Sequence, residues 1–504
     1  MIGSFRRFVS IGSFSVLGAI VAASAAAACG ATSTEQEIDQ QAQSVTPEDR
    51  MLIGIAEQYP SDPEASARTS EFAQSMKARR EFGWRVVEKV LSPVPIAAPK
   101  LDPDDPDVSG VLPRFQTWYG KTDVVAAFDQ LWVGMKAEDP AQVRDFRACE
   151  VDSVFRWNAE ERPKNLSTWN RDVYNARRAE LNDSEGVSSL GRNTRVLMSP
   201  AFVSHLLRNY RTLAGCVNKT MPLTQPPLSA ENHTRCMTSE FPADAAVIKA
   251  GWEPDGPTFP AYGTSAGDIQ SMLAAGTWPA PRAIAPPGPD AIYTMRALTS
   301  STGQPRAEKK RLAALHILTK ELRDWVWISL FWSEEPDLDF GADRPQSIRA
   351  LGGPWSHYKM VVNTAYDEED PDPGSGYADS APTLASALRS ARPNPPAEGS
   401  TVRTWASNPY IEREVRNGAT NCIGCHAHGG TKLSVQGLLD DETQYPDNTR
   451  RRVRAAFPAD YTWVTSQGGM DLGAIFKETL DGARTPSRLP GVQPRPCGMQ
   501  PRAR

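Results

Sequence analysis

Two cysteines and a histidine stand together near the end of the chain, in the order Cys422-Ile423-Gly424-Cys425-His426. This C-x-x-C-H spacing is the signature of c-type haem, in which both thiols bond to the porphyrin vinyl groups and the imidazole binds the iron. A thioredoxin-like pair would follow a strand of a βαβ unit, and a zinc site would need a second pair of ligands nearby. The surrounding sequence has neither pattern. We therefore expect one covalent haem c held by Cys422, Cys425 and His426.

The sixth ligand of the iron is less tightly specified by the sequence. Met470, between two glycines and an aspartate, lies 44 residues after His426, a feasible spacing for a compact domain. His316 is the rival, with a buried core histidine as the alternative interpretation of its place in an apolar strand. Another His or Met, or an open sixth position, also remains possible.

The N-terminus has the composition of a targeting segment. Arg6 and Arg7 precede an uncharged apolar stretch over residues 8–28, which ends in four alanines before Cys29. This pattern predicts a secretory signal, and the small residues before Cys29 resemble a bacterial lipobox. Plain secretion and an uncleaved membrane anchor are the alternatives. We expect a periplasmic or cell-envelope protein, anchored in the outer or inner membrane by a lipid on Cys29.

The other cysteines fit an oxidising compartment. When Cys29 and the two haem thiols are set aside, four cysteines remain, and four cysteines allow three connectivities. Cys216 and Cys236 enclose a short loop and form the favoured pair, which leaves Cys149 with Cys497. The alternative is that some of them are buried thiols.

Composition limits the fold and the partners. The 504 residues are too many for one ordinary core, and 55 basic against 60 acidic residues give a net charge of -5. This charge balance excludes a generally basic protein that coats nucleic acid. We expect that this protein does not bind nucleic acid and that its partner is a redox protein, whose identity the sequence does not give.

Hydrophobic patterning predicts an α+β fold with a mainly antiparallel sheet. The segment from Ala313 to Trp332 contains two apolar runs around a polar turn, which predicts a hairpin. Residues 245–252 and 291–298 supply two more strands, while 64–92 and 199–213 have helical spacing.

Within the hairpin, residues 325–332 are apolar on both faces, so both faces must be covered. Helices of the middle of the chain would cover one face. One candidate for the other cover is the haem segment, which would bring His316 close to the haem; the alternative is a closed sheet core far from the haem. Two further expectations are a helix over Tyr410–Arg416, capped by Asn408, and a solvated acidic loop over residues 367–373.

The region of about 400–485 resembles the small, mostly helical haem domain of mono-haem cytochromes c, with the C-x-x-C-H pentapeptide as its specific part. The wider chain, over about 110–470, resembles secreted bacterial cytochrome-like proteins of unassigned function. The matching segments are Leu315-His316-Ile317, Trp325-Val326-Trp327 and residues 408–412.

With the haem motif and the targeting segment, the sequence favours an extracytoplasmic electron-transfer protein with one haem. The alternatives are a haem enzyme acting on peroxide or a small molecule at an open iron position, and a haem sensor or structural lipoprotein, so the sequence leaves open whether the protein is an enzyme. We expect six parts in chain order: a signal segment (1–28), a tether (29–63), a peripheral helix with a Pro-rich linker (64–106), an α+β domain (107–398), a cytochrome c-like haem domain (399–485) and a Pro- and Arg-rich tail (486–504).

Overall fold

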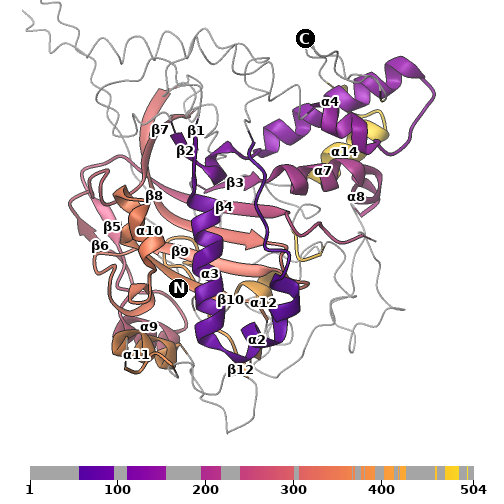
Figure 1. Cartoon of the computed structure of the whole chain (residues 1–504). Coiled ribbons are helices and arrows are strands. Elements are labelled where there is room, and N and C mark those ends of the chain that lie inside the picture. Colours follow the sequence, from indigo (N-terminus) through magenta and orange to yellow (C-terminus); the bar gives the residue numbers. More distant parts are fainter. Residues whose placement is uncertain are drawn as a thin grey trace, which may run out of the picture.

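The fold is seen in a computed structural model of the whole chain (Figure 1). The structure describes residues 56–95, 111–154, 194–216, 239–299, 306–365, 367–368, 376–379, 381–391, 402–413, 418, 421–426, 460–462, 472–486 and 497.

A six-stranded antiparallel sheet forms the centre of the described chain. Its strands follow one another in the order β10-β9-β8-β4-β3, and β7 also pairs with β8. The α+β class with a mainly antiparallel sheet is thereby confirmed. The bounds are β3 Thr194–Met198, β4 Ala246–Pro254, β7 Thr294–Thr299, β8 Arg306–Thr319, β9 Val326–Trp332 and β10 Tyr358–Asn363.

The predicted hairpin is the pair β8 and β9, in register from Thr319 opposite Val326 to Ala314 opposite Phe331. All seven residues of β9 are buried. Trp325 precedes β9 with φ of +66°, which costs a large side chain about 1–2 kcal/mol. Burial of its indole, which packs against Phe241 with ring centroids 5.5 Å apart, offsets this cost.

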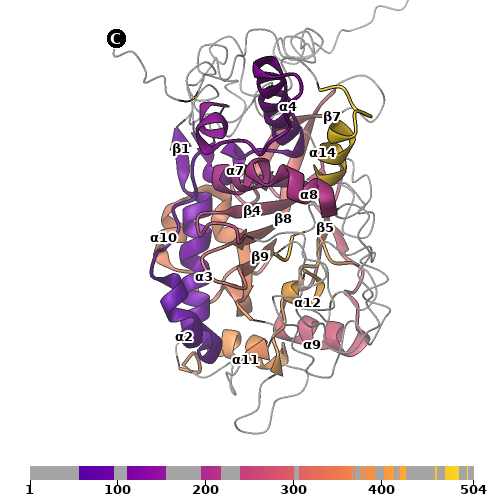
Figure 2. The ribbon, with the colours of Figure 1, turned by 90° about the vertical axis from the view of Figure 1, so that its right-hand side faces the viewer.

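Helix α3 (Met76–Leu91) covers one face of the sheet. Gly83 permits the close approach, because a Cβ there would lie 3.2 Å from the Met360 side chain on β10. The Arg80 guanidinium donates to the Met360 carbonyl oxygen at 2.6 Å. The helix that was expected to be peripheral is therefore part of the core. Figure 2 shows α3 and α12 (Cys422–His426) on opposite sides of the sheet.

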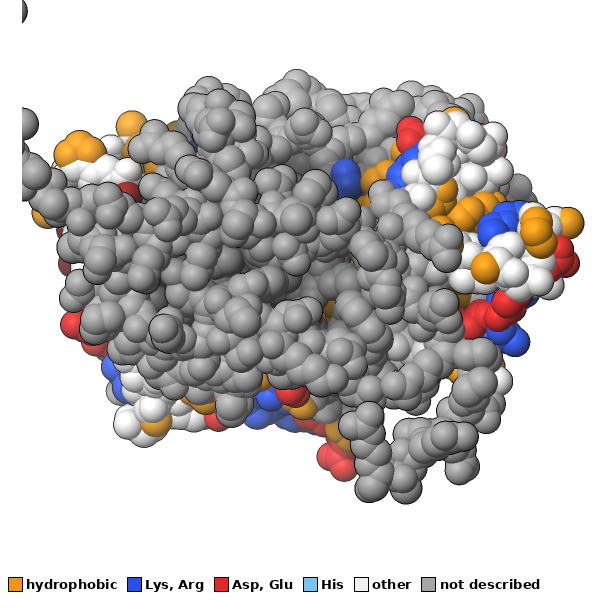
Figure 3. Space-filling view, turned by 90° about the horizontal axis from the view of Figure 1, so that it is seen from above, with side chains coloured by type: hydrophobic (Ala, Val, Ile, Leu, Met, Phe, Trp, Pro, Cys, Tyr) orange, Lys and Arg blue, Asp and Glu red, His pale blue; other side chains and the backbone are white. Residues whose placement is uncertain are grey.

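Four helices gather at one end of the molecule: α4 (Lys121–Glu138), α7 (Pro200–Arg208), α8 (Tyr210–Cys216) and α14 (Leu472–Leu480) (Figure 1). Phe128 and Phe476 join α4 to α14, with ring centroids 4.5 Å apart. Seen from above, this end carries acidic and basic side chains close to one another (Figure 3). None of the described helices is long and apolar enough to cross a membrane.

The remaining elements are shorter. The α-helices are α2 Thr69–Gln74, α9 Ala266–Ala275, α10 Gln346–Ala350 and α11 Pro382–Ser390, and the 3-10 helices are η2 Ala65–Arg68, η3 Arg114–Thr117, η5 Asp339–Gly341 and η6 Gly353–His357. Three two-stranded ladders pair β1 Pro93–Pro95 with β2 Val111–Pro113, β5 Phe259–Ala261 with β6 Arg282–Ile284, and β11 Asp367–Glu368 with β12 Val402–Arg403.

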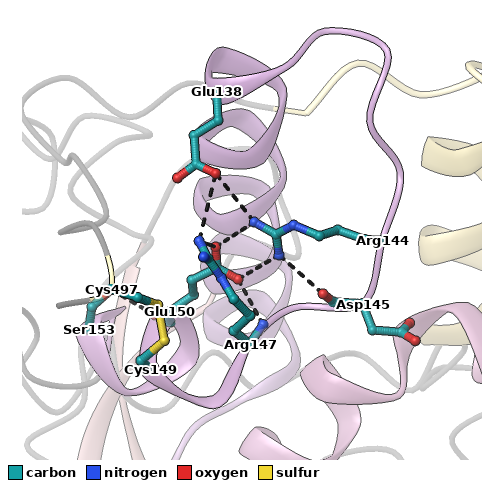
Figure 4. Close-up of a disulfide and its surroundings, with 8 residues drawn as sticks. All are labelled: Glu138, Arg144, Asp145, Arg147, Cys149, Glu150, Ser153 and Cys497. Atoms are coloured by element: carbon teal, nitrogen blue, oxygen red, sulfur yellow. Dashed lines mark hydrogen bonds and ion pairs between the residues drawn. A yellow bond between two sulfur atoms is a disulfide. The ribbon is translucent and has the colours of Figure 1, made fainter.

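A disulfide joins Cys149 to Cys497, which is the expected pair (Figure 4). Beside it, Arg144 and Arg147 both bind the carboxylate of Glu150. Burial pushes the pKa of Glu150 upward, but the two arginines outweigh burial and lower that pKa to about 2.

Cys216 is also disulfide-bonded. Its partner lies outside the described residues, and so does Cys236, with which it was expected to pair.

Candidate functional site

Helix α12 carries the C-x-x-C-H motif in a single helical turn. Asn421 caps this turn, because its side-chain oxygen accepts a hydrogen bond from the Gly424 N–H at 2.7 Å. The Asn421 amide also donates to the Thr404 carbonyl oxygen at 2.6 Å. The cap therefore fixes both the conformation of α12 and its attachment to the strand-forming segment before it.

Cys422 and Cys425 are three residues apart, so they share one face of this turn. Both are present as thiols, in a chain where Cys149, Cys216 and Cys497 are oxidised. Burial raises the pKa of Cys422 well above its ordinary value, and the Glu412 carboxylate adds to this effect. The structure places neither of the two cysteines in a disulfide.

The protonation of His426 follows from its partner. Its Nδ1 lies 2.9 Å from the carbonyl oxygen of Tyr461. A carbonyl oxygen only accepts hydrogen bonds, so Nδ1 carries the proton and Nε2 carries the lone pair in the neutral ring. Burial lowers the pKa of His426 to about 4, which keeps the ring neutral at pH 7. A neutral imidazole with its lone pair on Nε2 is the form that ligates a metal.

The carbonyl of Tyr461 reaches His426 from an unusual backbone conformation. Asp460 and Tyr461 both have positive φ, of +46° and +66°. This left-handed conformation costs about 1–2 kcal/mol per residue outside glycine. The cost is offset by contacts of both side chains, since Asp460 pairs with Lys320 at 3.1 Å and the Tyr461 hydroxyl donates to Asp324 at 3.3 Å.

Trp327 of β9 forms an aromatic wall beside His426. The centroid of its ring lies 4.6 Å from that of His426, with an angle of 50° between the planes. Its indole is 1% exposed, and its N–H donates to the Asp324 carbonyl oxygen at 2.8 Å. His426 of the C-x-x-C-H segment therefore contacts the face of β9 that carries Trp327.

His316 lies on the same face of the sheet. It pairs across the strands with Lys249 of β4 and Ser329 of β9, and laterally paired residues project to the same side. Residues two apart along a strand also share a face, so Ser329 places His316 on the side of Trp327. The positive charge that His426 carries when protonated helps to lower the pKa of His316, after burial and Lys249. The structure thus brings His316 close to the C-x-x-C-H motif.

The side chain of His316 is buried, with 9% of the residue exposed, and its Nε2 has no hydrogen-bond partner among the described residues. The nearest acid is Glu412, whose Oε1 lies 3.9 Å from this nitrogen. That distance is too long for a hydrogen bond. A buried ring nitrogen without a partner is costly, which points to a function or to a group that binds it.

The segment 408–412 fastens this region to the sheet. The side-chain amide of Asn408 donates to the Ser329 hydroxyl at 2.7 Å and to the Leu330 carbonyl oxygen at 2.9 Å. The side-chain oxygen of Asn408 accepts from the Tyr410 N–H at 3.0 Å, and Glu412 accepts from the Asn408 N–H.

The predicted helix over Tyr410–Arg416 is wrong where the structure describes it, because residues 409–411 form a turn. Asn408 caps that turn, and its side-chain amide is bound to β9.

A connected series of buried polar residues reaches the site from α3, and it was not predicted from the sequence. The acidic loop was expected to be solvated, but Glu368 is 0% exposed and pairs with buried Arg79 of α3 at 2.9 Å. Glu368 also accepts from the Thr404 hydroxyl at 2.6 Å, and the Thr404 carbonyl oxygen holds Asn421. The basic run Arg79-Arg80 on the apolar face of α3 was the sequence signal that a buried acid is required.

Met470 and Cys29 lie outside the described residues. Within the described ranges, no group of three or more His, Cys, Asp or Glu side chains is arranged to hold a metal ion by itself. Haem needs fewer protein ligands, because the porphyrin nitrogens occupy the equatorial positions of its iron. Comparison with family models, with curated proteins and with solved structures finds no match for this chain.

Proposed function

We propose that this protein is an extracytoplasmic electron-transfer protein with one covalently bound haem c. The observation that carries the proposal is the state of His426, a neutral ring with its Nδ1 proton fixed on a backbone carbonyl and its lone pair on Nε2, directly after two thiols on one helical turn. When bound, the haem would supply an iron that cycles between two oxidation states and so carries one electron.

The residues of this chain would have distinct roles. Cys422 and Cys425 would attach the haem, and His426 would bind its iron through Nε2. Tyr461 would hold the proton on Nδ1, which makes the ring a more electron-rich ligand. Trp327 would exclude water from the side of His426, because its buried indole covers the ring.

The sixth ligand is proposed to be Met470 or His316. The buried Nε2 of His316, without a hydrogen-bond partner among the described residues, supports the histidine. An absorption spectrum separates the two. His316→Ala should change the haem spectrum while Met470→Ala leaves it unchanged if the histidine is the ligand, and the reverse holds for the methionine.

Export and a lipid anchor at Cys29 are part of the proposal. The Cys149–Cys497 disulfide supports export, because disulfides persist in oxidising compartments and are rare in the cytosol. The partner would be a redox protein.

Covalent haem is the first property to test. The full chain, expressed with a haem-attachment system, should retain haem after denaturing electrophoresis and stain for it. The variant Cys422→Ala/Cys425→Ala should lose the stain, whereas Cys149→Ser/Cys497→Ser should keep it. A stained band from the first variant, or no stain from the wild-type chain, contradicts the proposal.

A haem enzyme is the second candidate, and the pair formed by His316 and Glu412 favours it. A buried imidazole 3.9 Å from a carboxylate could take up and release a proton next to a reacting ligand. Cyanide discriminates between the two candidates. Rapid binding of cyanide by the oxidised haem indicates an open position and the enzyme, and resistance to cyanide indicates a six-coordinate electron carrier.

A further inference from the structure

The left-handed turn that carries the Tyr461 carbonyl is held by the segment joining β8 to β9. Lys320, the first residue after β8, binds the Asp460 carboxylate at 3.1 and 3.2 Å, and the two residues are 4% and 7% exposed. The Lys320 ammonium also donates to the Arg323 carbonyl oxygen at 2.6 Å. The Phe241 N–H adds a weaker contact to the same carboxylate at 3.4 Å. The Asp460 side chain is therefore fixed from the sheet.

The same segment holds the ring of Tyr461. Asp324 accepts from the Tyr461 hydroxyl at 3.3 Å, and its carbonyl oxygen accepts from the Trp327 indole. Trp327 packs edge-on to Tyr461, with centroids 6.1 Å apart, and also contacts His426. Both residues of the strained turn are thus fixed by contacts from one connection between two strands.

We propose that Lys320 is a positioning residue for His426. Through its ion pair with Asp460, it keeps the backbone in the conformation that places the Tyr461 carbonyl on the Nδ1 proton. The consequence of this contact for redox chemistry rests on the proposed function. A ligand histidine that donates from Nδ1 gives more electron density to its metal, so Lys320 would help to set the reduction potential of the haem without touching it.

The direct test measures the hydrogen bond itself. In reduced holoprotein labelled with ¹⁵N-histidine, the Nδ1 proton of His426 should exchange with solvent about ten-fold faster in Lys320→Met than in the wild-type chain. Lys320→Arg, which keeps the cation, should retain most of the protection.

Lys359→Met is a matched control. Lys359 has a side chain that is 0% exposed and pairs at 3.5 Å with Asp339, which also has a positive φ of +53°. This pair lies outside the segment that holds His426, so its loss should leave the exchange rate within about two-fold. Equal exchange rates in Lys320→Met and Lys359→Met overturn the proposal.

A second variant covers the case in which Lys320→Met does not fold. Asp460→Asn removes the ion pair but keeps an oxygen that can accept from the Phe241 N–H, and it should also speed the exchange. The double variant Lys320→Met/Asp460→Asn should speed the exchange by less than the product of the two single effects, because the two residues share one ion pair. Unchanged exchange in Asp460→Asn contradicts the proposed role.

The inference can be separated from the proposed function. In Cys422→Ala/Cys425→Ala protein without haem, ring ¹⁵N shifts report whether the proton lies on Nδ1 or Nε2 of His426. Lys320→Met in this background should increase the Nε2–H form. If Lys320→Met changes the tautomer but the wild-type chain binds no haem, only the haem proposal is refuted. If Lys320→Met leaves the tautomer of His426 unchanged, the role of Lys320 is refuted.

Discussion

Asn408 fastens the segment before the C-x-x-C-H motif to the centre of the sheet, and its replacement by alanine tests this attachment. Its side chain makes three hydrogen bonds, of 2.7, 2.9 and 3.0 Å, and the residue is 0% exposed. Three bonds at about 1 kcal/mol each give about 3 kcal/mol. Leaving the Ser329 hydroxyl and the Tyr410 N–H buried without this partner raises the expected cost to about 3–5 kcal/mol.

Asn363→Ala is the matched control. Asn363 lies on β10, is also 0% exposed, and makes one long hydrogen bond of 3.5 Å, while its side-chain oxygen has no hydrogen-bond partner among the described residues. Both substitutions remove the same atoms, so the effect of the cavity is similar in the two variants. We expect Asn363→Ala to cost less than about 1 kcal/mol.

Hydrogen–deuterium exchange of the peptide containing residues 402–413 measures the difference locally. A cost of 3–5 kcal/mol should speed exchange of its protected amides by roughly 100- to 5000-fold in Asn408→Ala. Urea unfolding gives the same comparison for the whole molecule. Similar exchange rates in the two variants would show that the attachment of 408–412 to β9 contributes little, and the hydrogen-bond reasoning would fail.

Three further predictions concern stability. Glu150 has its pKa lowered from 4.5 to about 2, so its ion pairs stabilise the fold above pH 4.5 and this contribution is lost as the pH falls toward 2. The full shift of the pKa corresponds to about 3 kcal/mol, and the partial exposure of Arg147 reduces this value. Glu150→Gln should therefore lower the unfolding free energy by about 1–2 kcal/mol at pH 7 and should leave it unchanged near pH 2. A loss that does not depend on pH would contradict this prediction. Arg79→Met should lower the unfolding free energy by about 3–5 kcal/mol, because it leaves the buried Glu368 carboxylate without its ion pair. In urea unfolding, adding Glu368→Gln should recover part of that loss. Purely additive losses in the double variant would refute this prediction. Removal of the Cys149–Cys497 disulfide by a double serine substitution should cost about 2–5 kcal/mol, and an unchanged urea midpoint would show that the cross-link does not constrain the unfolded chain.

The sheet could be predicted from the sequence because its signal is local. In the run from Trp325 to Trp332 every residue except Ser329 is apolar, and such a run predicts a strand that is covered on both faces. The strands over 245–252 and 291–298 appear as β4 and β7 within a few residues of the predicted bounds.

The parts of the site that escaped prediction depend on long-range partners. Nothing near Glu368 in the sequence indicates that its carboxylate is buried against Arg79, nearly 300 residues earlier. The turn at Asn408 was mistaken for a helix because a capping residue followed by proline is a helix signal. The amide of that asparagine binds β9, which its neighbours in the sequence do not reveal.

The residues of the motif itself were predicted from their spacing alone, but their surroundings were not. The apolar faces of β9 indicated that the strand is covered, but not that Trp327 contacts His426. The role of Tyr461 was not foreseen, because any residue can supply a backbone carbonyl. Its left-handed conformation leaves no mark on the sequence when the residue is not glycine or asparagine.

The disulfide between Cys149 and Cys497 also constrains the order of events while the chain is being made. The two residues are 348 positions apart, and synthesis proceeds at about 5–20 residues per second, so Cys149 emerges roughly 20–70 s before its partner exists. During this interval Cys216, Cys236, Cys422 and Cys425 are produced in turn, and each is a competing thiol. A bridge from Cys149 to any of these cysteines would have to be broken before the Cys149–Cys497 disulfide could form. Capture of Cys422 and Cys425 by haem would remove two of the competitors before the last cysteine arrives.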